Sequence, residues 1–267
     1  MCLLVLAWRY HARYRLVLAA NRDEFHDRDA APLARWPAPA DIIAGRDLRS
    51  GGTWLGIDRR RRFGVVTNYR ELQPPLPAAP SRGALIPAYL AGCSAEAAAA
   101  AGPAEFFAGL EEPARRYSGF NLLLGAADSL WYGSNRSAPF ARALPPGLYG
   151  LANESLDTPW PKLERVRAGL QMWLHGGAAA GTEGLFALLA DRTEAQLAQD
   201  TSTGGLPRAW ARALSAPFVL HPQYGTRCST VLLIESGGGV HMIERRFDRA
   251  GQVSGQSEFH LRPQEWP

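Results

Sequence analysis

The chain has 267 residues, 46% of them hydrophobic, and a formal net charge of +4. This length allows a substantial hydrophobic core, in one large domain or two small ones. The basic residues are scattered, and the densest run, 59–62, is typical of an exposed hairpin turn, so we expect no nucleic-acid partner. Almost all the positive charge is arginine, with Lys162 as the only lysine, which indicates a coding bias.

The cysteines and the opening apolar run bear on the cellular setting. Cys2, Cys93 and Cys228 form no CxxC pair, and their spacing suits neither a zinc site nor a disulfide framework. The apolar run at the start is too short to span a membrane, and the basic residues that follow it do not fit a signal peptide. We therefore expect a protein with no membrane span in a reducing, cytoplasmic setting.

Short apolar runs between polar turns predict strands and loops in the first third of the chain. The predicted strands are 2–8, 15–20, 42–44, 54–58 and 63–67. The predicted loops and turns are 27–41, 47–53 and 73–80. Four polar residues, Asn21, Arg22, Asp23 and Glu24, follow directly on the second strand, so we expect them at a strand end.

The rest of the chain alternates between blocks of helices and pairs of strands. Alanine-rich or helically periodic segments predict helices at 84–91, 95–101, 104–110, 162–174, 184–190 and 193–199. The predicted strands are 119–125, 129–132, 147–152, 226–235, 240–247 and 257–261. Because strands pair with near neighbours and helices come in blocks, this order predicts an α+β fold with antiparallel sheets. We find no linker and expect a single domain over 1–267.

Cys2 is a candidate nucleophile because of its position. Methionine is normally removed when the next side chain is small, and Cys2 would then carry a free α-amine beside its own thiol. An α-amine has a pKa of about 7.7–8.0, so near neutral pH a useful fraction can accept the thiol proton. The alternative is that Cys2 is a small apolar residue of a buried strand.

Polar residues also stand at the ends of other predicted strands, which is the arrangement an acyl-transfer site needs. Asn68 follows one strand, Asn153 follows another, and Arg227 lies near the start of the last hairpin. Asparagine amides and backbone N–H groups stabilise an oxyanion, and a nearby arginine favours a thiolate. The asparagines also have a structural interpretation, since asparagine often satisfies backbone groups in turns, and the alternative for Arg22 is a structural ion pair with Asp23 or Glu24.

Seven segments together resemble one known family, over residues 1 to about 247. These segments are Met1-Cys2, Asn21-Arg22-Asp23-Glu24-Phe25, Gly51-Gly52-Thr53-Trp54-Leu55-Gly56, Thr67-Asn68-Tyr69-Arg70, Ser81-Arg82-Gly83, Leu156-Asp157-Thr158-Pro159-Trp160-Pro161-Lys162 and Tyr224-Gly225-Thr226-Arg227. They look like the NRDE family, also called the transport and Golgi organisation 2 family. That family in turn resembles the N-terminal nucleophile hydrolases of the choloylglycine hydrolase and penicillin V acylase type.

The resemblance implies a four-layer αββα sandwich, with two stacked antiparallel sheets between helices, and it implies that Cys2 is the nucleophile. The acylases carry an aspartate that orients the α-amine, and here either Asp23 or Glu24 stands at that place. Asn68 resembles the residue that supplies a backbone oxyanion donor. Asn153 resembles the side-chain oxyanion donor, and Arg227 resembles a late active-site arginine. The order of Asn21 and Arg22 is swapped relative to the acylases.

The sequence thus predicts a cysteine hydrolase or acyltransferase that acts on an amide or thioester of a small acyl substrate and requires no cofactor. The predicted catalytic residues are Cys2, Arg22, Asp23, Glu24, Asn68, Asn153 and Arg227. The alternative is a non-catalytic protein of the same fold that binds and carries haem or acyl-CoA. A third hypothesis is an interaction adaptor with a vestigial site.

Overall fold

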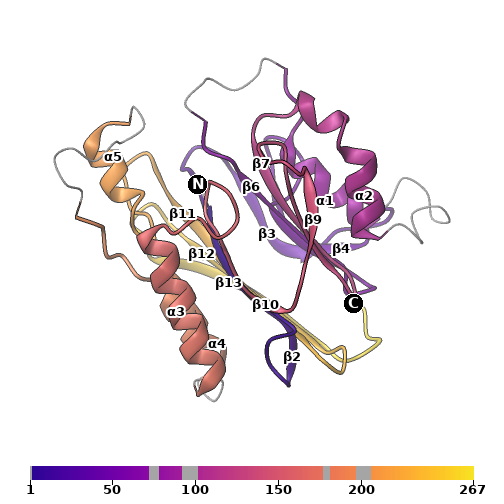
Figure 1. The fold of residues 1–267 in the computed structure, drawn as a ribbon. Helices are drawn as coiled ribbons and strands as arrows, with labels where there is room; N and C mark the ends of the chain where they lie inside the picture. Colours follow the sequence, from indigo (N-terminus) through magenta and orange to yellow (C-terminus); the bar gives the residue numbers. More distant parts are fainter. Residues whose placement is uncertain (1, 72–77, 92–101, 177–180, 197–205) are drawn as a thin grey trace.

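The computed structural model describes residues 2–71, 78–91, 102–176, 181–196 and 206–267. Its strands form two antiparallel sheets that face each other (Figure 1). The six-stranded sheet has the order β10-β1-β2-β11-β12-β13, and the seven-stranded sheet has the order β3-β4-β5-β6-β7-β8-β9. Helices cover the outer face of each sheet, so the predicted four-layer αββα sandwich of the α+β class is confirmed.

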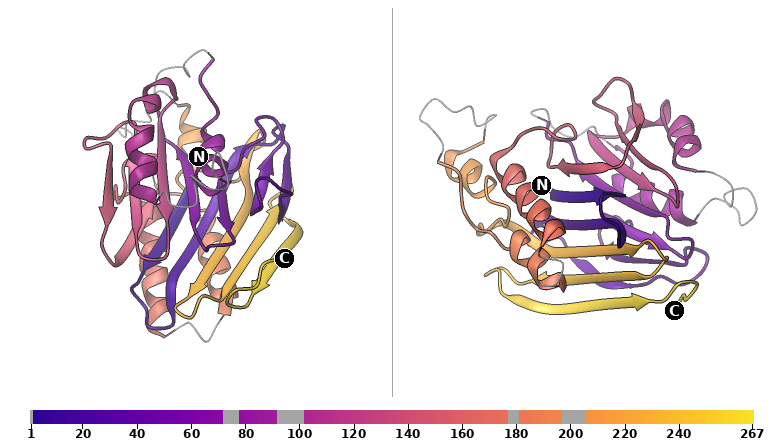
Figure 2. Two further views of the ribbon diagram at one scale, coloured as in Figure 1. Left: turned by 90° about the vertical axis from the view of Figure 1, so that its right-hand side faces the viewer. Right: turned by 60° about the horizontal axis from the view of Figure 1, so that its bottom comes forward.

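The six-stranded sheet joins the two ends of the chain. Figure 2 shows the N-terminal strands in indigo beside the C-terminal strands in orange and yellow. Its strands are β1 (Cys2–Trp8), β2 (Tyr14–Phe25), β10 (Gly147–Leu151), β11 (Tyr224–Glu235), β12 (Val240–Phe247) and β13 (Val253–Leu261). The seven-stranded sheet comes from the intervening chain: β3 (Ala30–Arg35), β4 (Ile42–Asp47), β5 (Leu55–Asp58), β6 (Phe63–Asn68), β7 (Phe120–Gly125), β8 (Leu130–Ser134) and β9 (Ala141–Leu144).

The helices lie in two groups on opposite outer faces (Figure 1). Against the seven-stranded sheet lie α1 (Leu85–Ala91) and α2 (Pro103–Leu110), with short 3-10 helices at Arg82–Ala84 and Pro113–Arg116. Against the six-stranded sheet lie α3 (Pro161–His175) and α4 (Gly181–Leu189), and α5 (Arg208–Ala213) follows. Pro161 starts α3 at a position where its fixed φ suits a helix and its missing N–H costs nothing.

The alternation along β1 explains the layers. Leu4, Leu6 and Trp8 point between the sheets, whereas Leu3 and Val5 point to the layer of α3 and α4. Because both faces of β1 are apolar, the strand is buried on both sides, as a central strand of a sandwich must be. The same alternation sends Cys2 to the side between the sheets.

Two predictions for the first third of the chain are wrong. The strand predicted at 15–20 continues through the polar cluster, and β2 ends only at Phe25, since β11 pairs along the whole length of this segment. Residues 27–41, predicted as a loop, contain β3. This strand tolerates Pro32 because it lies at a sheet edge, and its pairing with β4 shifts register between Ala31 and Ala34.

The other predicted strands and the helices at 84–91, 104–110, 162–174 and 184–190 are confirmed within a few residues. The helix predicted at 193–199 is wrong for 193–196, which form no helix because Thr193 bonds the Asp191 side chain and its carbonyl accepts from Arg165. Residues 197–199, the helix predicted at 95–101 and most of the loop at 73–80 lie outside the described residues. The short elements β9 and α5 were not predicted, since neither has a distinct apolar period.

Candidate active site

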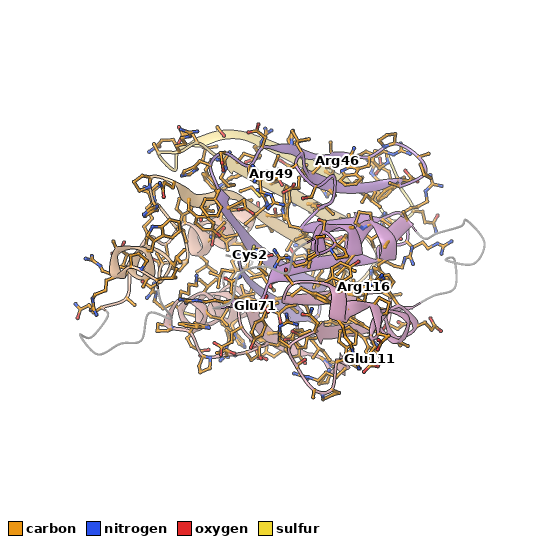
Figure 3. All side chains as sticks on the ribbon, turned by 90° about the horizontal axis from the view of Figure 1, so that it is seen from above. Cys2, Arg46, Arg49, Glu71, Glu111 and Arg116 are labelled. Carbon is orange, nitrogen blue, oxygen red and sulfur yellow. The ribbon has the colours of Figure 1, made fainter. Side chains whose placement is uncertain are left out.

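Cys2 lies at the first residue of β1, at one end of the sandwich. In the view of Figure 3, down onto this end, Cys2 lies near the middle of the molecule, with Arg46 and Arg49 on one side and Glu71 on the other. The strand register sets Cys2 opposite Arg22 of β2 and sets Arg22 opposite Cys228 of β11. The three side chains therefore form a row across the sheet face that is turned toward the second sheet.

Asn153 ties Cys2 to the second sheet. The backbone N–H of Cys2 donates to Asn153 Oδ1 at 3.1 Å, and Asn153 Nδ2 donates to the carbonyl oxygen of Asn68 at 2.8 Å. The N–H of Arg70 donates to the backbone carbonyl of Asn153 at 2.6 Å, which fixes the asparagine from behind. The structure thus brings Asn153 and Asn68 beside Cys2. Cys2 N–H can only donate and the carbonyl oxygen of Asn68 can only accept. The Asn153 amide is therefore oriented with Oδ1 toward Cys2 N and Nδ2 toward Asn68 O.

The backbone of Asn68 faces the same space. The N–H of Tyr69 donates to Gly119 O on the β7 side of β6, whereas the N–H of Val66 donates to Trp54 O on the β5 side. Since N–H groups alternate along a strand, the N–H of Asn68 points to the β5 side, beyond Leu55, where β5 begins. The backbone N–H of Asn68 is therefore directed to the β5 side of β6, and Asn68 lines the same cavity as Cys2.

Arg22 is buried between the sheets, where a carboxylate and an aromatic ring contact its guanidinium. Its Nη2 donates to Asp47 Oδ2 at 3.2 Å, and its guanidinium lies over the ring of Trp54 at 4.4 Å from the centroid. The Arg22 side chain is 7% exposed. Arg28 Nε also donates to Asp47 Oδ2, at 2.7 Å. Burial alone would raise the pKa of Asp47, but these two arginines and its hydrogen bonds outweigh it and hold that pKa low.

Asp23 and Glu24 point to opposite faces of β2. Asp23 is buried, and its Oδ1 accepts a hydrogen bond from Thr226 Oγ1 at 2.7 Å. Burial raises the pKa of the Asp23 carboxyl, against the opposing charge of Lys162 and the bond from Thr226. Glu24 shares the face of Cys2 and Arg22 and forms an ion pair with Arg28 at 3.6 Å. Asp23 is close to the Cys2 thiol through its backbone N–H, whereas the Glu24 side chain lies on the same sheet face as the Cys2 side chain.

Opposing effects act on the pKa of the Cys2 thiol. Burial raises the pKa of this thiol and the Asp23 carboxylate adds to the increase, while the Asp23 peptide N–H and the Arg22 guanidinium act in the opposite direction. The net direction is upward, so little thiolate forms spontaneously at neutral pH. A thiol in this setting needs a base to become a nucleophile.

Arg227 lies apart from this group. It is the extra residue of a β-bulge in β11, between Thr226, which pairs with Asp23, and Cys228, which pairs with Arg22. Its Nη1 donates to the backbone carbonyl of His26 at 3.1 Å and also contacts His26 Nδ1 at 3.1 Å. Arg227 is not among the residues that line the cavity described below.

Asn21, the first residue of the polar cluster, has a structural role. Its Nδ2 donates to the carbonyl oxygens of Leu189 and Pro217, each at 2.9 Å, and its Oδ1 accepts from Ser229 Oγ at 2.5 Å. The side chain is 1% exposed and joins β2 to the chain after α4. Asn21 therefore holds the strand in place, while the side chains of Arg22 and Glu24 lie on the sheet face of Cys2.

Sequence reasoning missed several residues that surround the site. Asp47 and Trp54 hold Arg22, and Arg28 completes the ion pairs around Asp47. Lys162 is buried at the start of α3, where its Nζ donates to Leu214 O at 2.8 Å. Burial lowers the pKa of Lys162, while Asp23 and Cys2 raise it by their charge. The available signals were its place in one of the family segments and its status as the only lysine among so many arginines.

A cavity of about 340 Å³ opens in front of Cys2. This volume lies at the lower end of the range for small-molecule sites. Its lining residues are Cys2, Arg22, Asp23, Glu24, Arg28, Asp47, Ser50, Thr53, Trp54, Val66, Asn68, Ala78, Ala79, Pro80, Ser81, Arg82, Gly83 and Ser118. The lining is mixed, with three arginines, three carboxylates and an apolar part, so the cavity suits a small ligand with both polar and apolar groups.

Two glycines explain how one wall of the cavity is built. A Cβ on Gly52 would collide with the backbone carbon and oxygen of Gly83, so only glycine allows the two segments to pack backbone to backbone. The N–H of Thr53 donates to Gly83 O at 3.0 Å, which holds the contact. The segment that carries Ser81 and Arg82 is thereby fixed against the turn before β5.

Gly52→Ala is therefore expected to lower the free energy of unfolding by about 1–3 kcal/mol, the usual cost of forcing extra volume into a packed contact. Gly109→Ala serves as the control, because Gly109 lies exposed in α2 with nothing within 4 Å of an added Cβ. That change is expected to be neutral or stabilising by up to about 1 kcal/mol. Urea unfolding of both variants measures the difference, and equal effects would contradict the role given to Gly52.

Comparison with known proteins places the chain in a family. The family described as Transport and Golgi organisation 2 matches residues 1–249. The chain belongs to the transport and Golgi organisation 2 family. The resemblance of the motifs to this family is thus confirmed.

Members of the transport and Golgi organisation 2 family from animals cover nearly the whole chain. The homologues from Bos taurus and Homo sapiens are 35% and 34% identical over 251 and 250 residues, or 87% of this chain and 86% of each relative. The Drosophila melanogaster protein is 28% identical over 255 residues, or 86% of each chain. Among the described residues of this family member, no helix has the length and apolar character needed to cross a membrane.

Proposed function

We propose that the chain, once Met1 is removed, is a cysteine hydrolase or acyltransferase that cleaves an amide or thioester of a small acyl substrate. The observation that carries this proposal is the bond from Cys2 N to Asn153 Oδ1 at 3.1 Å. Removal of Met1 converts that N–H into an α-amine, and Asn153 would then hold the amine beside the thiol of the same residue. The site thus has a place for both the nucleophile and its base at the edge of the cavity.

The proposed first half-reaction forms an acyl-enzyme. The neutral α-amine takes the thiol proton, directly or through one water, and the Cys2 sulfur attacks the carbonyl carbon. The Asn68 N–H and the second hydrogen of Asn153 Nδ2 donate to the oxyanion, each such donor being worth about 10²–10³ in rate. When the C–N or C–S bond breaks, the proton held by the α-amine passes to the leaving amine or thiol.

The second half-reaction releases the acyl group. A water, or another acceptor, gives its proton to the α-amine as its oxygen attacks the thioester carbon. The C–S bond to Cys2 then breaks, the thiol recovers the proton, and the acid or the transferred acyl product leaves. Arg22 and the neighbouring carboxylates set the field around the thiol, and neither half-reaction needs a cofactor.

The alternative function is binding and transport of haem or acyl-CoA without turnover. Among the described lining residues, Cys2 is the only side chain of a kind that ligates haem iron. The cavity volume, at the lower end for ligand sites, favours the small acyl substrate. The two functions make different predictions for pH dependence.

The proposed base predicts the pH profile of Cys2 in the processed chain. Because burial raises the pKa of the thiol, the thiol needs a base, and the proposed base is the amine, with an ordinary pKa of about 7.7–8.0. Activity should be low where the amine is protonated, rise as pH increases through the amine pKa, and level off above it. Release of thiol or amine from small acyl thioesters and amides, measured from neutral to alkaline pH, gives this profile.

The chain that retains Met1 is the control for this profile. Its Cys2 carries an amide N–H, so alkylation of the thiol should keep rising with pH well beyond the amine pKa. Identical profiles for the two forms would contradict the amine as base. A processed chain that binds haem or acyl-CoA tightly but releases no product from any acyl compound would favour the carrier.

A further inference from the structure

The three arginines that line the cavity differ in their partners. Arg22 and Arg28 both form ion pairs with Asp47, and Arg28 also pairs with Glu24. Arg82 is different, because no carboxylate of the described residues lies within ion-pair distance of its guanidinium. Its one hydrogen bond there runs from Nη1 to the backbone carbonyl of Gly119, at 3.0 Å. A guanidinium has five N–H donors, so most of its donor capacity is unused.

No carboxylate of the described residues near Arg82 forms an ion pair with its guanidinium. The nearby Glu71 is occupied, since Arg136 forms an ion pair with it and the N–H of Gly119 donates to its Oε2 at 2.8 Å. Burial lowers the pKa of Arg82 and the charge of Arg28 adds to this, against the smaller opposing effects of Cys2, Glu24 and Glu71, yet an arginine stays charged at any ordinary pH. A partly desolvated positive charge with few partners is unfavourable by itself and favours binding of an anion.

Arg82 is also held in place before any ligand arrives. The backbone contact of Gly83 with Gly52 and the bond from Thr53 N to Gly83 O fix the segment on the cavity wall. The bond to Gly119 O restrains the guanidinium from its other side. A charged donor that is already positioned loses little entropy on binding, and the planar guanidinium matches a carboxylate or phosphate through two parallel bonds.

We propose that Arg82 binds an anionic group of the substrate, a carboxylate or a phosphate, while Cys2 attacks the acyl carbonyl in the same cavity. This inference rests on the proposed function and adds the substrate class: small acyl compounds that carry negative charge away from the scissile bond. Arg82 is a specificity residue in this account, because it touches the substrate but takes no part in proton transfer.

The test uses three acyl thioesters that share one reactive carbonyl and differ at the far end, which is a carboxylate, a phosphate or a methyl ester. Intact mass follows the rate at which each acylates Cys2 in the processed protein. The unmodified protein should react with one of the anionic compounds about 10- to 100-fold faster than with the ester, as a charge-assisted bond implies. The faster anionic compound identifies carboxylate or phosphate as the group bound.

Three variants locate the preference. Arg82→Gln should lose the preference for the anionic compound over the methyl ester, and Arg82→Lys should retain part of that preference. Arg49→Gln is the matched control, because Arg49 is exposed on the same end of the molecule but does not line the cavity (Figure 3). It should keep the full preference. Equal rates for anionic and neutral compounds, or a preference that survives Arg82→Gln, would overturn the inference.

A binding measurement separates this inference from the proposed reaction. The ligands are the free acids of the carboxylate and phosphate thioesters, which have no thioester bond and are unreactive. Calorimetric titration of Cys2→Ala with each acid should show binding, and Arg82→Gln in the same background should weaken that binding at least about 10-fold. If no thioester acylates Cys2 but this binding is lost in Arg82→Gln, the reaction is wrong and the anion site stands. If Cys2 is acylated but neither acid binds, the anion site is wrong and the reaction stands.

Discussion

Cys2→Ala and Cys2→Ser are expected to lower turnover of any acyl substrate on the order of 10⁴-fold or more, the usual scale for removal of a nucleophile. The physical reason is that the sulfur forms the bond to the acyl group, and no other described thiol lines the cavity. Binding of an unreactive acid should change little, because the thiol contributes only a small part of the cavity surface. Steady-state kinetics together with calorimetry separate the two effects.

Cys228→Ala is the matched control for this prediction. Cys228 lies in the same row of side chains, opposite Arg22, but it is 3% exposed and does not line the cavity. Burial raises the pKa of its thiol well above the ordinary value, and the Glu244 carboxylate adds to the increase, so the thiol is inert. Activity in this variant should stay within a few-fold of normal. Full activity of Cys2→Ala would refute the nucleophile.

The second large effect concerns the N-terminus itself. A leader that a specific protease removes directly before Cys2 allows one preparation to be assayed before and after cleavage. Before cleavage, Cys2 N is an amide and cannot take a proton, so turnover should be at least about 100-fold lower than after cleavage, the lower bound expected for loss of a general base. The measurement is product release by equal amounts of the two forms.

Obstruction of the cavity by the leader would also lower activity, so a second, shorter extension is needed. A single glutamine inserted between Met1 and Cys2 keeps the methionine in place, adds little bulk and adds no charge near the cavity. This variant should bind an unreactive acid with a dissociation constant close to that of the processed protein, yet turn over substrate at least about 100-fold more slowly. Turnover by the uncleaved or extended chains at the normal rate would mean that the α-amine is not the base.

The sequence predicted the fold well where the pattern was local. β1 has apolar residues on both faces, which is visible in 2–8 and typical of a central strand. The end of β2 was not predictable in the same way. Residues 21–24 are polar, and they stay in the strand because β11, about 200 residues later in the chain, supplies their hydrogen bonds. No local pattern contains that partner.

The site shows the same limit. Cys2, Asn68 and Asn153 were expected together from strand ends and from the family resemblance, and the structure does bring them together. The Asn153 amide, however, presents its oxygen to Cys2 N, an orientation that no sequence pattern specifies. Arg227 has a place in the motif, but the bulge in β11 directs it to His26.

Residues that act through space were the hardest to find. Asp47 reaches Arg22 from the other sheet, and Arg82 lies on the cavity wall because two glycines allow a backbone contact. Gly52 and Gly83 belong to the sequence segments that resemble the family. Their contact with each other, however, depends on how the 3-10 helix at Arg82–Ala84 packs against the turn before β5. Such contacts follow from the packing of the layers and not from any one segment.

The most direct test of the central claim is the intact mass of the purified protein before and after a short exposure to an electrophilic acyl probe. The account predicts that the protein lacks one methionine and gains a single acyl group, which peptide mapping places on Cys2, and that the adduct is absent in Cys2→Ala. A chain that retains Met1 and leaves Cys2 unmodified by the probe would contradict an N-terminal nucleophile, and haem and acyl-CoA binding would then be the function to measure.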